Sequence, residues 1–232
     1  MSDAGDLFDE HAAAYDEELA QGLSASGESR EYFANGRIAW LARCLEELRE
    51  APQAVLDFGC GDGSTTPLLL TILQAQSATG IDVSEKALAV ACRQHATPQI
   101  GFEPLGGFEA QAKFDLAYCN GVFHHIAPHQ RGSALALVRR ALRDGGLFAL
   151  WENNPWNPAT RYVMSRIAFD RDAQMLTPPE TRALLRDNGF QVLRTDFRFI
   201  FPRALHFLRR MEDFAYRWPL GTQYQVLSRK AG

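Results

Sequence analysis

A short apolar segment is followed directly by three glycines that alternate with other residues. The segment Ala54-Val55-Leu56-Asp57-Phe58 runs into Gly59-Cys60-Gly61-Asp62-Gly63. Glycine lets the backbone turn sharply and approach a bound ligand without a side-chain clash. The carboxylate of Asp57, at the end of the segment, suits a ligand that carries an ammonium group. We therefore expect a ligand-binding loop between a buried strand and a helix that begins at Ser64.

The spacing of these glycines differs from that of loops that bind dinucleotides. Such loops carry GxGxxG, whereas position 64 is a serine here and the spacing is GxGxG. Asp62 would in addition repel a diphosphate. The sequence therefore disfavours an NAD-dependent enzyme. Cys60 is predicted to be a small buried filler rather than a nucleophile, because buried cysteines usually pack as small apolar residues.

A second acidic residue ends the next predicted strand, in the run Gly80-Ile81-Asp82-Val83-Ser84. It stands 25 residues after Asp57. A carboxylate in this position can accept hydrogen bonds from both hydroxyls of a ribose. Val83 would then lie under an adenine ring. We therefore expect Asp82 to be the ribose-binding residue.

The elements that position these residues follow from the spacing of the apolar residues. Short apolar runs predict strands at 54–58, 77–82, 99–103, 114–119 and 146–151. The connecting runs 64–75, 84–96 and 130–143 carry apolar residues at helical spacing. This alternation predicts βαβ units, with a parallel sheet and helices on both of its faces.

A further helix is predicted at Thr177-Pro178-Pro179-Glu180, where Thr177 is the N-cap and Glu180 closes a capping box. It should end near Asn188-Gly189, and strands should follow at 190–199 and 222–228.

Three segments lie outside the alternation. The first 50 residues look helical, with one long amphipathic helix over 28–50, and 152–176 is a Pro/Asn-rich insertion. The third is an aromatic and basic segment at 202–218. We interpret the chain as one domain with a helical cover.

The composition excludes several other classes of protein. The 232 residues are 46% hydrophobic and 22% charged, which is enough to bury a core and argues against disorder. The net charge of −4 gives no overall case for a nucleic-acid partner, and residues 1–31 hold nine acids against one base. No apolar stretch is long enough to span a membrane. Four cysteines without CxxC spacing predict free thiols, and hence a cytoplasmic protein.

Three motifs together resemble the class I S-adenosylmethionine-dependent methyltransferases. They are the glycine loop, the acid motif around Asp82, and the run Asn120-Gly121-Val122-Phe123-His124-His125-Ile126 after the fourth strand. The last of these resembles the small-molecule branch, including the methyltransferases of ubiquinone and menaquinone pathways. The turn Leu142–Leu147 also fits the family.

The resemblance covers residues 53–152 and carries expectations about the whole chain. It implies an α/β, Rossmann-like, seven-stranded and mostly parallel sheet, with helices on both faces, the last strand antiparallel and an N-terminal helical cover. The single domain 1–232 would then divide into the cover at 1–50, the cofactor-binding half at 53–152, and substrate-side elements at 153–232.

The resemblance also assigns contacts to S-adenosylmethionine, which would leave as S-adenosylhomocysteine. The loop of Phe58, Gly59, Cys60 and Gly61 would pass the methionine end, and Asp57 would orient the amino group. Asp82 would bind the ribose, with Val83 under the adenine. The backbone of Asn120 would face the cofactor. Tyr15 and Arg37 are candidates for the methionine end, since an arginine pairs well with a carboxylate.

Recognition of the adenine amino group departs from the family. The family often places an acid after the third strand, where Gly106-Gly107 stand here. Recognition would therefore fall to backbone groups around Leu105–Phe108, with the ring of Phe108 stacking on the adenine.

The two histidines at the end of the fourth strand are the candidate catalytic residues. The pKa of histidine, about 6.5, makes it a usable base at cellular pH. Only one of two adjacent side chains can readily face the reacting groups. We expect His124 to be the base and His125 to be a packing, hydrogen-bonded residue. Related enzymes carry acids that bind a divalent ion here, but Gly121 and His124 leave too few oxygen ligands, so we expect no metal.

Two segments after the fifth strand are candidates for binding the substrate. Glu152–Pro158 would form part of its wall, or a plain Pro/Asn turn. Within 202–218, an apolar stripe occurs at helical spacing, formed by Leu205, Leu208, Met211, Ala215 and Trp218. Packing of this stripe onto the sheet is the favoured interpretation. A wall for an apolar or lipid-linked substrate and a docking face at a membrane surface are the alternatives.

The sequence thus predicts methyl transfer from S-adenosylmethionine to a small molecule, with oxygen favoured over nitrogen and carbon as the acceptor atom. A protein or nucleic-acid methyltransferase is disfavoured by the acidic balance of the chain. A catalytically silent protein that binds the cofactor and acts through partners is the remaining alternative. The oligomeric state does not follow from the sequence.

Overall fold

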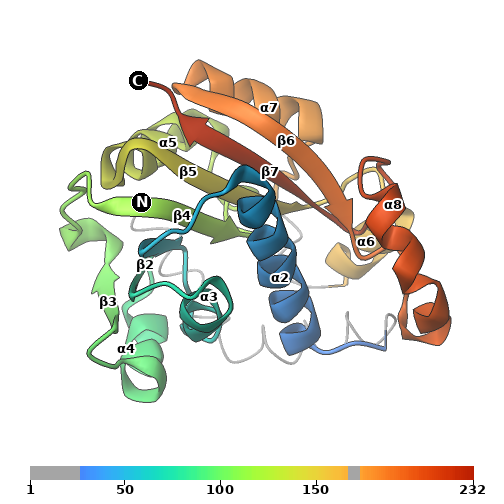
Figure 1. Ribbon diagram of the computed structural model, residues 1–232, viewed down its shortest axis with the longest axis horizontal. Helices are drawn as coiled ribbons and strands as arrows, with labels where there is room; N and C mark the ends of the chain where they lie inside the picture. The colour runs from blue at the N-terminus through green and yellow to red at the C-terminus, as the bar shows by residue number, and fades with distance from the viewer. Residues whose placement is uncertain (1–26, 167–172) are drawn as a thin grey trace.

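The computed structural model describes residues 27–166 and 173–232, and a seven-stranded sheet crosses this part of the chain (Figure 1). The strand order is β3-β2-β1-β4-β5-β7-β6. The strands are β1 Ala54–Phe58, β2 Ser77–Asp82, β3 Ile100–Pro104, β4 Phe114–Asn120, β5 Leu142–Asn153, β6 Phe190–Arg198 and β7 Gln223–Lys230. β1 to β5 pair in parallel, and β7 runs antiparallel to both β5 and β6. The predicted fold class is therefore confirmed.

The helices are α2 Arg30–Leu48, α3 Thr66–Leu73, α4 Glu85–His95, α5 Pro128–Ala141, α6 Pro158–Met164, α7 Pro178–Asp187 and α8 Glu212–Ala215, with 3₁₀ turns η1 Leu105–Gly107 and η3 Arg203–Met211. The helices α2 to α5, together with α7, begin and end close to predicted positions, whereas α6 lies in the segment predicted as a Pro/Asn-rich insertion. The capping box of α7 is present, since the Glu180 N–H donates to Thr177 Oγ1 and the Glu180 carboxylate accepts from the Thr177 N–H. α2 is the long helix expected over 28–50. The rest of the expected cover, residues 1–26, lies outside the described residues.

Alternate side chains of the central strands belong to two separate hydrophobic cores, one on each face of the sheet. Val55, Leu116 and Ala149 pack with α2 and α3 on one face of the sheet. Leu56, Ala117 and Leu150 pack with α5 and α7 on the other. This alternation is what a strand buried on both faces requires. In Figure 1, α2 lies across the front of the sheet. Because β1, β2, β4 and β5 are parallel, their carboxyl ends lie along one edge of the sheet, where the sequence places the candidate site.

The segment 202–218 differs from its prediction. It is not one α-helix, because η3 is a 3₁₀ helix interrupted at Leu205 and α8 has four residues. The expected apolar stripe does not pack onto the sheet, since Leu205, Met211 and Trp218 are all exposed. The segment is instead held by Glu212, whose buried carboxylate accepts hydrogen bonds from the backbone N–H groups of residues 199, 200 and 201.

The fifth strand is longer than predicted. It begins at Leu142 rather than at residue 146, because Leu142 already pairs with Phe114 before a shift in register. Gly145 has φ +75° inside this irregular start, a conformation that favours glycine. In the described part of the chain, no helix has the length and apolar character needed to cross a bilayer.

Candidate functional site

The glycine loop connects β1 to α3 in left-handed backbone conformations. Gly59, Gly61 and Gly63 have φ of +75°, +55° and +75°. A Cβ on Gly59 would overlap the side chain of Val122, so the loops after β1 and β4 are in tight contact. A Cβ on Gly61 would meet nothing within 4 Å. Gly61 therefore presents bare backbone to the space beside the loop, as a ligand-binding turn requires.

Asp82, the last residue of β2, fixes the glycine loop. Its Oδ2 accepts a hydrogen bond of 2.8 Å from the Gly61 N–H, and its Oδ1 accepts one of 2.9 Å from the Ser84 N–H. The carbonyl of Ile81 accepts from the N–H groups of Gly59 and Cys60. The next side chain, Val83, is 37% exposed although it is apolar. The expected ribose-binding acid and an uncovered apolar surface thus stand side by side next to the loop.

Asp57 is a buried carboxylate at the end of β1. It is 2% exposed and accepts a 2.7 Å hydrogen bond from Thr66 Oγ1. Burial raises its pKa to about 7, against the opposing effects of the Thr66 hydrogen bond and the charge of Arg37. A buried acid of this kind gains most from a cationic ligand, because that ligand restores the stability of the charged form.

Arg37 reaches the same region from α2. Its side chain donates from Nε to the Tyr118 hydroxyl and from Nη1 to Gln223 Oε1, both at 3.1 Å, and Gln223 donates in turn to Asn153 Oδ1 at 3.2 Å. Within the described residues, no acceptor is bonded to Nη2. Arg37 is only 6% exposed, so its orientation is fixed by β4, β5 and β7. Sequence reasoning missed Gln223, which no local motif marks.

His124 forms a buried pair with an acid that sequence reasoning did not assign to catalysis. Its Nδ1 lies 2.6 Å from Glu152 Oε2, and the two side chains are 3% and 1% exposed. Glu152 Oε1 also accepts from the Phe123 N–H at 2.9 Å, which holds the loop after β4 against β5. The signal in the sequence was an acid near the end of a strand, as at Asp57.

The division of roles between the two histidines stays a prediction. His124 is the more buried of the two and has the 2.6 Å contact with Glu152. His125 is half-buried, and its ring centroid lies 4.1 Å from that of His124. Gly121, with φ +68°, turns the chain between the end of β4 and the two histidines.

The other residues predicted to contact the cofactor after β3 and β4 differ in how exposed they are. Gly106 and Gly107 form η1 after β3, and a Cβ on Gly106 would meet nothing within 4 Å. Phe108 is buried, and its ring centroid lies 6.2 Å from that of Phe114. This packing supports a role of Phe108 in the core over stacking on the adenine. Asn120 ends β4, beside the turn in which the Gly121 N–H donates to the Trp151 carbonyl.

Three predicted cofactor-binding residues remain, two from the loop and one from the N-terminal cover. Phe58 belongs to the core on the α5 side of the sheet. Cys60 is 7% exposed and burial raises the pKa of its thiol, as expected of a filler. Tyr15 lies outside the described residues.

The segment after β5 is held to the start of β7. Asn154 donates to the carbonyls of Pro219 and Gly221, and Asn157 donates to that of Leu220. These contacts make the segment an ordered part of the edge at which β5 ends. Its role as a substrate wall stays a prediction. No group of three or more metal-ligating side chains occurs among the residues that the structure describes.

The residues at this edge fit S-adenosylmethionine. The ligand would place its amino group at Asp57, its carboxylate at Arg37 and its ribose at Asp82. Its adenine would cover Val83, and the bare backbone of Gly61 would allow close approach. Each of these residues offers the complementary charge, hydrogen-bonding group or surface, and Asp57 in particular lacks a cation bonded to it among the described residues.

Comparisons with known proteins show which family the chain resembles. Residues 56–148 match the family model for a methyltransferase domain. An uncharacterised methyltransferase of Synechocystis is 30% identical over 164 residues, which cover 65% of this chain and 73% of the relative. A trans-aconitate 2-methyltransferase of Methylobacterium nodulans is 30% identical over 120 residues, 51% of this chain but only 45% of the relative.

A solved structure extends the likeness of the fold to almost the whole chain. The S-adenosylmethionine-dependent methyltransferase of Thermotoga maritima superposes with a TM-score of 0.67 over 98% of this chain and 99% of its own, at 14% sequence identity. The fold, the glycine loop and the relatives all indicate the same family. The chain belongs to the class I S-adenosylmethionine-dependent methyltransferases.

Proposed function

We propose that this methyltransferase acts on a hydroxyl oxygen of a small molecule, with His124 as the general base. When bound, the cofactor supplies a methyl group already activated by its sulfonium. The observation that carries the proposal is the buried pair of His124 and Glu152, at the end of β4 and beside the glycine loop. A base in this place is useful only for an acceptor that must lose a proton.

Glu152 acts on the reaction through His124. Its carboxylate accepts a hydrogen bond from the N–H at Nδ1 of His124, and in that tautomer the lone pair of the neutral ring is on Nε2. Nε2 is then the atom that removes the proton of the acceptor hydroxyl. The negative charge of Glu152 stabilises the imidazolium that forms. Glu152 also accepts a hydrogen bond from the Phe123 N–H, which fixes the position of its carboxylate beside His124.

The class of acceptor follows from the need for a base. Trans-aconitate, the substrate named for one relative, offers carboxylate oxygens that are already ionised at neutral pH. A histidine base would give such an acceptor no advantage. A phenol, enol or alcohol gains from it, because its oxygen becomes nucleophilic only as the proton leaves. This reasoning favours a hydroxyl acceptor over a carboxylate.

A screen with radiolabelled S-adenosylmethionine tests the acceptor class. We expect label to pass to hydroxylated aromatic acids such as 4-hydroxybenzoate, or to related enols and alcohols, and not to benzoate. Trans-aconitate serves as the carboxylate control. Transfer to benzoate and trans-aconitate, with the hydroxylated acceptors inert, would contradict the proposal and leave methyl transfer itself intact.

The pKa of Asp57 predicts that cofactor binding depends on pH. Because that pKa is raised to about 7, the carboxylate is mostly protonated at pH 6 and mostly ionised at pH 7.5. An ammonium group binds the ionised form, so affinity should rise with pH. We expect S-adenosylhomocysteine to bind roughly eightfold more weakly at pH 6 than at pH 7.5.

Calorimetric titration at the two pH values measures this effect, and Asp57→Asn is the control. The amide still accepts from Thr66 but cannot ionise. The variant should bind weakly and equally at both values. A wild-type affinity that is flat across this range would show that Asp57 does not face the amino group.

We also infer that the protein works in a reducing compartment such as the cytoplasm. The support is that all four cysteines are free thiols, of which Cys44, Cys60 and Cys119 are buried and Cys92 is exposed. Proteins of oxidising compartments usually pair such residues.

A further inference from the structure

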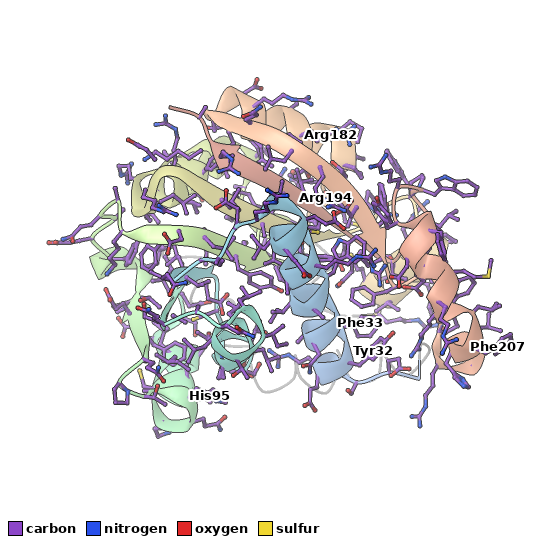
Figure 2. All side chains as sticks on the ribbon, in the orientation of Figure 1. Tyr32, Phe33, His95, Arg182, Arg194 and Phe207 are labelled. Carbon is purple, nitrogen blue, oxygen red and sulfur yellow. The ribbon has the colours of Figure 1, made fainter. Side chains whose placement is uncertain are left out.

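Residues 203–220 present an unusual concentration of apolar side chains to solvent. Nine large hydrophobic side chains are exposed in the described part of the chain, and six of them belong to this segment: Leu205, Phe207, Met211, Phe214, Trp218 and Leu220. Phe214 is 87% exposed and Phe207 is 67% exposed. Figure 2 shows Phe207, a residue of η3, at the outer margin of the molecule and away from the sheet. We refer to the exposed side of residues 203–220 as the aromatic face.

The aromatic face is exposed although its inner side is firmly anchored. Glu212 is buried and accepts three backbone hydrogen bonds from residues 199–201. Arg209 forms an ion pair of 2.6 Å with Glu28 and lies over the ring of Tyr32 at 4.6 Å. Tyr216 packs against Trp40 at 5.1 Å between ring centroids. The apolar side chains therefore project from a fixed platform and are not left out by loose packing.

The charges on the aromatic face are positive, although the chain as a whole is acidic. Arg203, Arg210 and Arg217 are exposed between the apolar side chains. The exposed acid of the segment, Asp213, is bonded to Arg198 at 3.1 Å and lies 3.5 Å from Arg43, so its charge is compensated. Among the described residues, the exposed side of the segment therefore carries three uncompensated positive charges, although the protein has a net charge of −4.

This combination selects one kind of partner. Aromatic and aliphatic side chains at a membrane interface bury their apolar parts among the lipids, while neighbouring arginines contact anionic headgroups. A second copy of this chain would bring arginines against arginines. A nucleic acid would satisfy the arginines but leave aliphatic side chains such as Leu205 and Met211 without apolar cover. The face thus fits an anionic lipid surface best.

We propose that the aromatic face binds the surface of an anionic lipid bilayer. The interaction is peripheral and adds to methyl transfer without depending on it. The face adjoins the site, because Asn154 and Asn157 hold residues 219–221 against the segment that follows β5. Docking through residues 203–220 would bring the carboxyl edge of the sheet close to the membrane, where an apolar acceptor would be concentrated.

Sedimentation of the full-length protein with vesicles tests the proposal without any substrate. Vesicles of phosphatidylcholine mixed with phosphatidylserine should carry the wild-type protein into the pellet, and vesicles of phosphatidylcholine alone should not. Phe207→Ser combined with Phe214→Ser should abolish binding, since both rings are exposed and their loss leaves the core intact. Arg203→Glu with Arg210→Glu should weaken binding by more than about 20-fold, from about fivefold for each charge lost.

The matched control is Arg93→Glu with Arg186→Glu, which changes the net charge by the same amount at exposed positions of α4 and α7. It should bind the anionic vesicles within a few-fold of the wild type. The proposal is overturned if the wild-type protein stays in the supernatant with both kinds of vesicle, or if the control weakens binding as much as the variant of the face. Binding of single-stranded nucleic acid in place of anionic vesicles would also overturn it. Methyl transfer in solution is measured on the same samples, so failure here is distinguishable from failure of the proposed function.

Discussion

Replacement of Asp82 by alanine is expected to weaken binding of S-adenosylhomocysteine by at least about 100-fold. Hydrogen bonds to a charged group contribute about 1.5–3 kcal/mol each, and two ribose hydroxyls would lose theirs. The same substitution removes the acceptor that holds the Gly61 N–H at 2.8 Å and the Ser84 N–H at 2.9 Å. The ribose contact and the shape of the glycine loop are therefore lost together. Isothermal titration calorimetry measures the change.

Asp62→Ala is the matched control for this substitution. Asp62 belongs to the same loop and its removal changes the charge equally, but its carboxylate pairs with Arg30 and Ser64 on the outside of the loop. The control should retain affinity within a few-fold of the wild type. An unchanged affinity in Asp82→Ala, or an equal loss in both variants, would refute the assigned role of Asp82.

Replacement of His124 by alanine is expected to lower kcat by about 10²–10⁴-fold, the range typical of a lost general base. Affinity for S-adenosylhomocysteine should stay unchanged, because no cofactor contact is assigned to His124. Glu152→Gln should lower kcat to a lesser degree, since the amide can still accept a hydrogen bond from the ring but cannot stabilise its charge. Turnover with a hydroxylated acceptor from the radiolabel screen measures both effects.

A comparison of turnover with cofactor affinity separates a catalytic role for His124 from a structural one. A catalytic role predicts that His124→Ala lowers kcat and leaves the affinity for S-adenosylhomocysteine unchanged. His129→Ala, at an exposed position of α5, is the control and should behave as the wild type. Full turnover in His124→Ala would end its candidacy as the base.

The sequence predicted the glycine loop and its place between a strand and a helix because the determinants there are local. The glycines, Asp57 and Asp82 stand at the ends of strands whose apolar runs are unmistakable, and parallel strands bring their carboxyl ends to one edge. The structure confirms the predicted sheet, and it shows Gly59 and Gly61 in left-handed conformations that favour glycine. Local patterns were sufficient for this part of the fold.

The pairing of His124 with Glu152 could not be predicted in the same way. The two residues are 28 positions apart, and their contact depends on the register between β4 and β5 and on the turn at Gly121. The contact between Arg37 and Gln223 spans 186 positions and joins the cover to β7. Such contacts are properties of the tertiary structure.

The segment 202–218 was wrongly predicted for a different reason. Apolar residues at helical spacing usually mark a buried face, and here the same spacing marks an exposed one. The polar contacts of Glu212 and Arg209 and the packing of Tyr216 on Trp40 hold the segment, while its large apolar side chains stay exposed. Apolar residues retained at a solvent-exposed surface are more readily explained by binding than by stability.

The central claim is that the edge formed by Asp57, Gly61 and Asp82 binds S-adenosylmethionine. Its most direct test is a calorimetric titration of the purified protein with S-adenosylhomocysteine, and with NAD in parallel. The account predicts saturable binding of S-adenosylhomocysteine and no heat of binding with NAD. Binding of NAD, with no binding of S-adenosylhomocysteine, would contradict it.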